Sequence, residues 1–149
     1  MTTKAAFSPE EWTLVLNGPV SAGMIMITAA HGGMVRETLA VSKAYVEARR
    51  LHGQSELLDE IVASKPKADH AKYHSREELR DHGLQTLRDA MTVLRDKATA
   101  DEVEDYRRFV RTLSDKVAAA HRENGQSVSP AEADAIGQIV AAVADRDPE

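Results

Sequence analysis

The sequence predicts an all-α fold, a bundle of six or seven helices built around two helical hairpins. Three Ser-x-x-Glu capping boxes mark helix starts, because the serine and glutamate bond the backbone N–H groups that a first turn leaves without partners. Apolar residues recur at spacings of three and four, which is typical of helices with one buried face. No segment sustains the alternation typical of a strand. The 149 residues fit one domain, residues 1–149, with 1–7 and 145–149 expected to be flexible.

The first capping box, Ser8 to Glu11, opens a short helix that we expect to end before Asn17-Gly18-Pro19. Pro19 suits the first turn of a second helix, which runs to about residue 31. Gly32-Gly33 then interrupts the chain, and a third helix follows over residues 34–50. Its expected inward side chains include Val41, Tyr45 and Val46.

Residues 55–64 predict a short fourth helix, and residues 65–74 form the expected connection to the next one. The second capping box, Ser75 to Glu78, opens a helix that fades near Ala98. Its apolar face comprises Leu79, Leu84, Leu87, Met91 and Leu94.

A long helix is expected from about residue 101, where four acidic residues suit the positive end of the helix dipole. Its expected inward face comprises Val103, Tyr106, Val110, Leu113, Val117 and Ala120. The pair Asn124-Gly125 ends this helix. The third capping box, Ser129 to Glu132, opens the last helix, whose expected buried residues are Ile136, Ile139, Val140 and Val143.

Composition excludes several classes of function. The chain has no cysteine, which excludes disulfides, thiolate metal sites and cysteine nucleophiles. Its net charge of −5 argues against non-specific nucleic-acid binding, which requires a basic face. The uncharged run over residues 12–35 is divided by Asn17-Gly18-Pro19, so we expect a core helix and no membrane span. No secretory signal is evident, and we expect a cytoplasmic protein.

One arrangement of polar residues occurs twice. In the first hairpin, His31 ends an apolar stripe, and Glu37 lies at the edge of the next helix's apolar face. In the second hairpin, His121 ends a stripe and Glu132 precedes Ile136 by one turn. Each copy contains Ala-Ala-His, at residues 29–31 and 119–121. We expect each histidine to lie near its glutamate across the turn, with both pairs partly shielded from water.

Two interpretations of these pairs stay open. Histidine and carboxylate groups from facing helices are common ligands of zinc, iron or manganese, so His31, Glu37, His121 and Glu132 form a candidate site for a divalent transition metal. Alternatively, a local hydrogen bond between histidine and glutamate explains each pair without metal. Glu132 also has a capping role with Ser129, and a histidine in a last turn is favoured by the helix dipole alone.

The final segment, Asn124 to Glu132 with the apolar helix after it, resembles the tellurite-resistance TerB-like family of all-helical domains. That family carries a turn, a Ser-Pro stretch and a glutamate that opens the next helix. The pattern appears twice there, and its acidic residues are implicated in metal binding. In this chain the Ala-Ala-His-Gly-Gly segment with Glu37 corresponds to the first copy. His31 stands where the family has an aspartate, and Asn124 or His121 does so in the second copy, so the carboxylates of the family are largely replaced here. The resemblance covers the two hairpins and does not extend to residues 53–100.

The sequence therefore favours a non-enzymatic cytoplasmic module for stress response, metal response or protein interaction. The alternative is a metal-binding protein or metalloenzyme that uses the four residues of the hairpins. We also expect a protein partner or a homodimer, because seven helices present more apolar faces than one compact bundle easily covers.

Overall fold

The computed structural model describes residues 4–29, 34–50, 56–63, 75–122 and 130–144. Every regular element within these ranges is helical, which confirms the predicted all-α bundle. The elements are the 3₁₀ turn η1 (Lys4–Ala6) and the helices α1 (Pro9–Ala29), α2 (Met34–Arg50), α3 (Glu56–Ala63), α4 (Arg76–Lys97), α5 (Ala100–Arg122) and α6 (Pro130–Val143).

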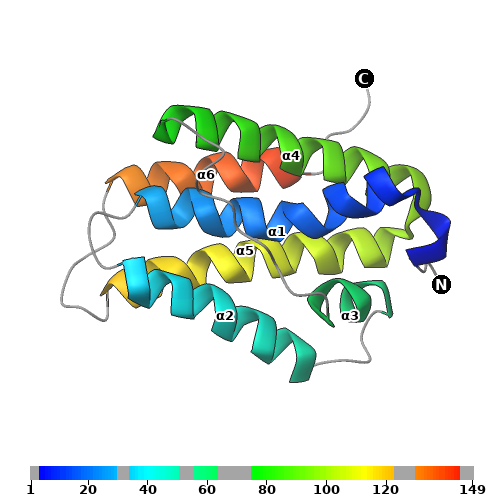
Figure 1. Ribbon diagram of the computed structural model, residues 1–149, viewed down its shortest axis with the longest axis horizontal. Helices are drawn as coiled ribbons and strands as arrows, with labels where there is room; N and C mark the ends of the chain where they lie inside the picture. Colours follow the sequence, from blue (N-terminus) through cyan, green and yellow to red (C-terminus); the bar gives the residue numbers. More distant parts are fainter. Residues whose placement is uncertain (1–3, 30–33, 51–55, 64–74, 123–129, 145–149) are drawn as a thin grey trace.

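Helix α1 lies in the middle of the bundle (Figure 1). Its most extensive contact is with α4, and it also packs against α5, α6 and α2. Helix α2 lies along α5, while α6 packs against α4, α1 and α5. The short helix α3 contacts α2 and α5 at the end of the bundle that also holds η1 (Figure 1).

The expected break at Asn17-Gly18-Pro19 is wrong, because α1 continues through these residues as one helix. Proline lacks an N–H, so the helical bond that residue 19 would donate to the carbonyl of Val15 is missing. The hydroxyl of Tyr106, on α5, donates to that carbonyl over 2.7 Å. A tertiary contact therefore replaces the backbone bond that Pro19 removes.

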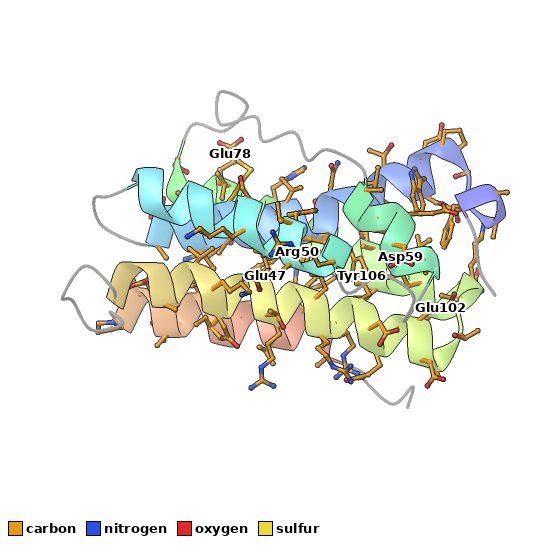
Figure 2. The ribbon with its side chains drawn as sticks, turned by 90° about the horizontal axis from the view of Figure 1, so that it is seen from below. Glu47, Arg50, Asp59, Glu78, Glu102 and Tyr106 are labelled. Carbon is orange, nitrogen blue, oxygen red and sulfur yellow. The ribbon has the colours of Figure 1, made fainter. Side chains whose placement is uncertain are left out.

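Gly18 makes room for this contact. A Cβ at Gly18 would lie 2.0 Å from the Tyr106 hydroxyl oxygen, too close for any side chain to coexist with it. Tyr106 is 1% exposed and lies inside the bundle (Figure 2). Burial raises the pKa of the Tyr106 hydroxyl well above its ordinary value, so the group stays a protonated donor.

The expectation of no membrane span was based on a break at Asn17-Gly18-Pro19, and α1 has no break there. The helix is long and apolar enough to cross a membrane by length and composition alone. Within the bundle, 56% of its apolar window is buried against the other helices.

Capping residues start the helices largely as predicted. At α1, the backbone N–H of Ser8 donates to Glu11 Oε1 (2.8 Å), and the N–H of Glu11 donates to Ser8 Oγ (3.2 Å). At α4, the N–H of Glu78 donates to Ser75 Oγ over 3.1 Å. Ser129, the expected cap of α6, lies outside the described residues.

The core confirms the predicted inward faces of α4 and α5. Every described member of those two faces is buried: Leu79, Leu84, Leu87, Met91 and Leu94 on α4, and Val103, Tyr106, Val110, Leu113 and Val117 on α5. On α2, Tyr45 is buried and meets Phe109 edge-on, with ring centroids 5.2 Å apart. Val46, expected to face inward, is 41% exposed. The inward side of α2 is therefore turned toward Ala44 and Tyr45.

Candidate functional site

The buried side of α6 begins with a carboxylate. Glu132 lies in the first turn and is 0% exposed. Ala135, Ile139 and Ala142 follow at helical spacing and are buried with it, whereas Ile136 and Val140 are only half-buried. The prediction that Glu132 is shielded from water is confirmed. The predicted inward face of the last helix is correct at Ile139 and Val143 and not at Ile136 and Val140.

Burial of the Glu132 carboxylate has an energetic cost that other groups must compensate. Transfer of a carboxylate from water into a protein interior costs several kcal/mol unless donors, a proton or a metal ion compensate the charge. The position at the start of α6 compensates part of it, because the helix dipole favours a negative group there. Glu132 is thus a fully buried acidic group in the first turn of α6.

Two other glutamates in the first turns of helices show that this position alone does not require burial. Glu78, in the first turn of α4, is exposed. Glu102, in the first turn of α5, is 7% exposed, accepts from the N–H of Thr99 (2.9 Å), and its own N–H donates to Thr99 Oγ1 (3.2 Å). Figure 2 shows Glu102 near the end of the bundle that holds α3 and Glu78 nearer the opposite end. Packing around each helix start decides how deeply its glutamate is buried.

The ends of four helices gather near Glu132. Helix α1 ends at Ala29, α2 begins at Met34, α5 ends at Arg122 and α6 begins at Pro130. Figures 1 and 2 both show these four ends at the same end of the bundle. The helix ends that flank the two predicted turns thus lie at one end of the bundle, which a site shared between the two hairpins requires.

Of the four predicted ligands, Glu132 alone has a described side chain. His31 lies outside the described residues. Glu37 lies in the first turn of α2 and His121 in the last turn of α5, and their side chains are outside the described set. The predicted proximity of each histidine to its glutamate therefore stays a prediction. Among the described side chains, no three histidine, aspartate or glutamate groups gather to hold a metal.

Histidines also occur outside the two hairpins. His70 and His74 lie in 64–74, outside the described residues. His82 is exposed on α4, on the side of the helix away from the buried Leu87 and Leu94.

A different polar contact joins the opposite end of the bundle. Lys97 Nζ, at the end of α4, lies 2.5 Å from Glu11 Oε1 and donates to the carbonyl of Ala6 over 3.2 Å. The hydrogen bond from Lys97, with the capping bonds from Ser8, holds the pKa of Glu11 below its ordinary value. No sequence pattern links these residues, since they are 86 positions apart.

Two local signals in the sequence were missed. Thr99 and Glu102 form a fourth capping box, readable as Thr-x-x-Glu. Phe7 and Trp12 flank the Ser8 cap at the spacing of a hydrophobic staple, and their ring centroids lie 5.7 Å apart. Residues 4–7, expected to be flexible, accordingly contain η1 and a Phe7 that is 8% exposed.

Comparison of the chain with family models, curated proteins and solved structures finds no match.

Proposed function

We propose that this chain is a non-enzymatic helical module that acts by binding, and that it binds a divalent transition metal at the end of the bundle where α6 begins. Complete burial of Glu132 carries this proposal, since a buried carboxylate is a strong partner for a cation. A role in stress or metal response agrees with the TerB-like pattern that the second hairpin resembles.

The proposed ligands select the kind of metal. His31, Glu37, His121 and Glu132 would supply imidazole nitrogen and carboxylate oxygen. This mixture suits zinc, iron or manganese, whereas calcium and magnesium prefer oxygen ligands alone. The shared end of α1, α2, α5 and α6 supports the proposal, because ligands from two hairpins need a common location.

A capping role for Glu132 is the competing interpretation, and one substitution separates the two. Glutamine can replace glutamate in a capping box, because its side-chain oxygen still accepts from the backbone. Glu132→Gln therefore preserves the shape and the cap but removes the negative charge. Glu102→Gln is the matched control, since Glu102 is also a buried glutamate in a first turn and belongs to a cap at the other end of the bundle.

The test is metal analysis and thermal unfolding of protein purified without an affinity tag. Zinc or manganese at about 100 times its Kd should raise the Tm by about 5–10 °C, and EDTA should reverse the rise. Glu132→Gln should lose the bound metal and the rise in Tm, whereas Glu102→Gln should keep both. Wild-type protein with no bound metal and no rise, or equal rises in both variants, would contradict the proposal.

We also propose a cytoplasmic location and a protein partner, with a second copy of the chain as the first candidate. Both proposals rest on the sequence. Light scattering at micromolar concentration tests the homodimer, and a particle of 16.3 kDa would contradict it.

A further inference from the structure

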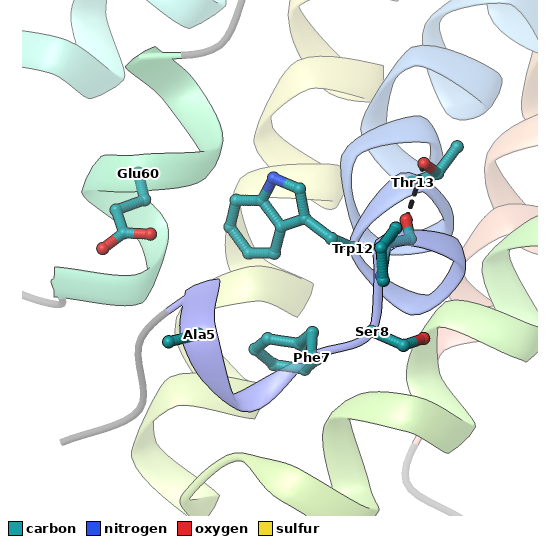
Figure 3. Close-up of a pocket in the computed structure, with 7 residues that line it drawn as sticks. Ala5, Phe7, Ser8, Trp12, Thr13 and Glu60 are labelled. Atoms are coloured by element: carbon teal, nitrogen blue, oxygen red, sulfur yellow. Dashed lines mark hydrogen bonds between the residues drawn. The ribbon is translucent and has the colours of Figure 1, made fainter.

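An open hollow lies at the end of the bundle opposite to Glu132, between the start of α1 and the facing side of α3 (Figure 3). Its volume is about 800 Å³. The lining residues come from η1, the cap of α1, its first turns and α3: Ala5, Phe7, Ser8, Pro9, Trp12, Thr13 and Glu60.

Two aromatic rings form one wall of this hollow. The rings of Phe7 and Trp12 are inclined at 42° to each other, so their faces meet at an angle rather than stack. They are 8% and 7% exposed, so packing holds both rings in place and a small part of each borders the hollow. Figure 3 shows the indole of Trp12 projecting from α1 into the space that faces α3.

The polar groups of the lining favour a positive ligand. Ser8 Oγ accepts from the N–H of Glu11, and Thr13 Oγ1 donates to the carbonyl of Pro9, so both hydroxyls already bond within α1. Among the lining residues, Glu60 is the one with a charge, and it lies on α3 across from Trp12 (Figure 3). A carboxylate repels anions and attracts cations.

We propose that this hollow binds a small organic cation, an ammonium group that carries apolar substituents. The charged centre would lie between the Glu60 carboxylate and the aromatic rings, because ring faces attract cations. The apolar substituents would bury surface against Phe7 and Trp12. This site is separate from the metal site proposed above and can be tested without it.

Trp12 makes the test direct, because it is the single tryptophan of the chain and its fluorescence reports on the hollow. The probe is choline, and its uncharged isostere 3,3-dimethylbutan-1-ol is the control. Choline should change the fluorescence saturably, and the isostere should bind at least about tenfold more weakly. The absence of a saturable change with choline, or equal binding of the isostere, would overturn the proposal.

Two variants of α3 test whether the Glu60 carboxylate is the group that attracts choline. Glu60→Gln should weaken choline binding about tenfold. Asp59→Asn removes a neighbouring charge that does not line the hollow, so choline affinity should stay within about twofold. Equal choline affinity in wild type and Glu60→Gln would overturn the proposal. If Glu60→Gln fails to fold, the difference in affinity between choline and its isostere, measured on the wild-type protein, tests the proposal instead.

Discussion

The middle of the bundle and its two ends contain polar groups of different kinds. In the middle, the carbonyl of Val15 that Pro19 leaves without a helical donor accepts from the buried hydroxyl of Tyr106. At the ends, the proposed binding groups are carboxylates: Glu132 at the start of α6, and Glu60 facing an aromatic wall. The neutral contact inside the bundle replaces a missing backbone hydrogen bond, whereas the two buried or half-buried carboxylates at its ends are the groups for which we propose ligands.

The largest expected effect comes from filling the space beside Tyr106. Gly18→Ala should destabilise the protein by about 3 kcal/mol, because the new Cβ displaces Tyr106 and breaks its bond to Val15. Gly137→Ala, in α6, is the matched control, since a Cβ there meets no atom within 4 Å. It should stabilise by up to about 1 kcal/mol through helix propensity. Urea unfolding measures both, and equal effects of the two substitutions would contradict the account of Gly18.

A smaller effect isolates the hydrogen bond itself. Tyr106→Phe should cost about 1–3 kcal/mol, because the buried carbonyl of Val15 loses its donor. In a Pro19→Ala background the N–H of residue 19 can donate to that carbonyl, so the same substitution should cost at least about 1 kcal/mol less. A double-mutant cycle by urea unfolding tests this coupling. Strict additivity would show that Tyr106 does not compensate for the proline.

The smallest effect concerns the ion pair at the end that holds η1, and it depends on pH. The pKa of Glu11 is lowered by Lys97, so the pair stabilises the folded state above the ordinary carboxyl value of 4.5 and this contribution is lost as pH falls through the lowered pKa. Lys97→Met should therefore lower the urea midpoint at pH 7 and lower it less at pH 3. A difference between variant and wild type that is independent of pH would contradict this assignment.

Local signals in the sequence predicted the helix starts and most of the core. The serines at residues 8 and 75 cap as expected, and the described apolar faces of α4 and α5 are buried. These features depend on residues within three or four positions of each other. Val46 was misplaced because the rotation of α2 is decided by its contacts with α5, α3 and α1.

Continuity of α1 could not be predicted from residues near Pro19. Asn17, Gly18 and Pro19 together are a strong local signal for a break. The donor that compensates for the proline is Tyr106, which is 91 positions from Val15. A helix breaker can therefore be tolerated when a distant side chain bonds the carbonyl that it exposes, and only the packing of α5 on α1 reveals that side chain.

Prediction of the candidate site was partial for a similar reason. The periodicity of α6 places Glu132 on the inward face, and its burial is confirmed. The gathering of the four helix ends depends on how the two hairpins pack, which periodicity does not determine. The hollow beside Trp12 requires α3 to lie opposite α1, although the Phe7 and Trp12 staple was readable from spacing alone.

Titration of isotope-labelled protein with zinc, followed by amide NMR shifts, tests the metal-binding claim most directly. We predict saturable shifts for the amides around the start of α6 and the adjoining ends of α1, α2 and α5, with no change at the Trp12 indole. These shifts should disappear in Glu132→Gln. Shifts spread along the exposed carboxylates of α4 and α5, or no saturable shift at all, would contradict the claim that the end of the bundle at Glu132 is a metal-binding site.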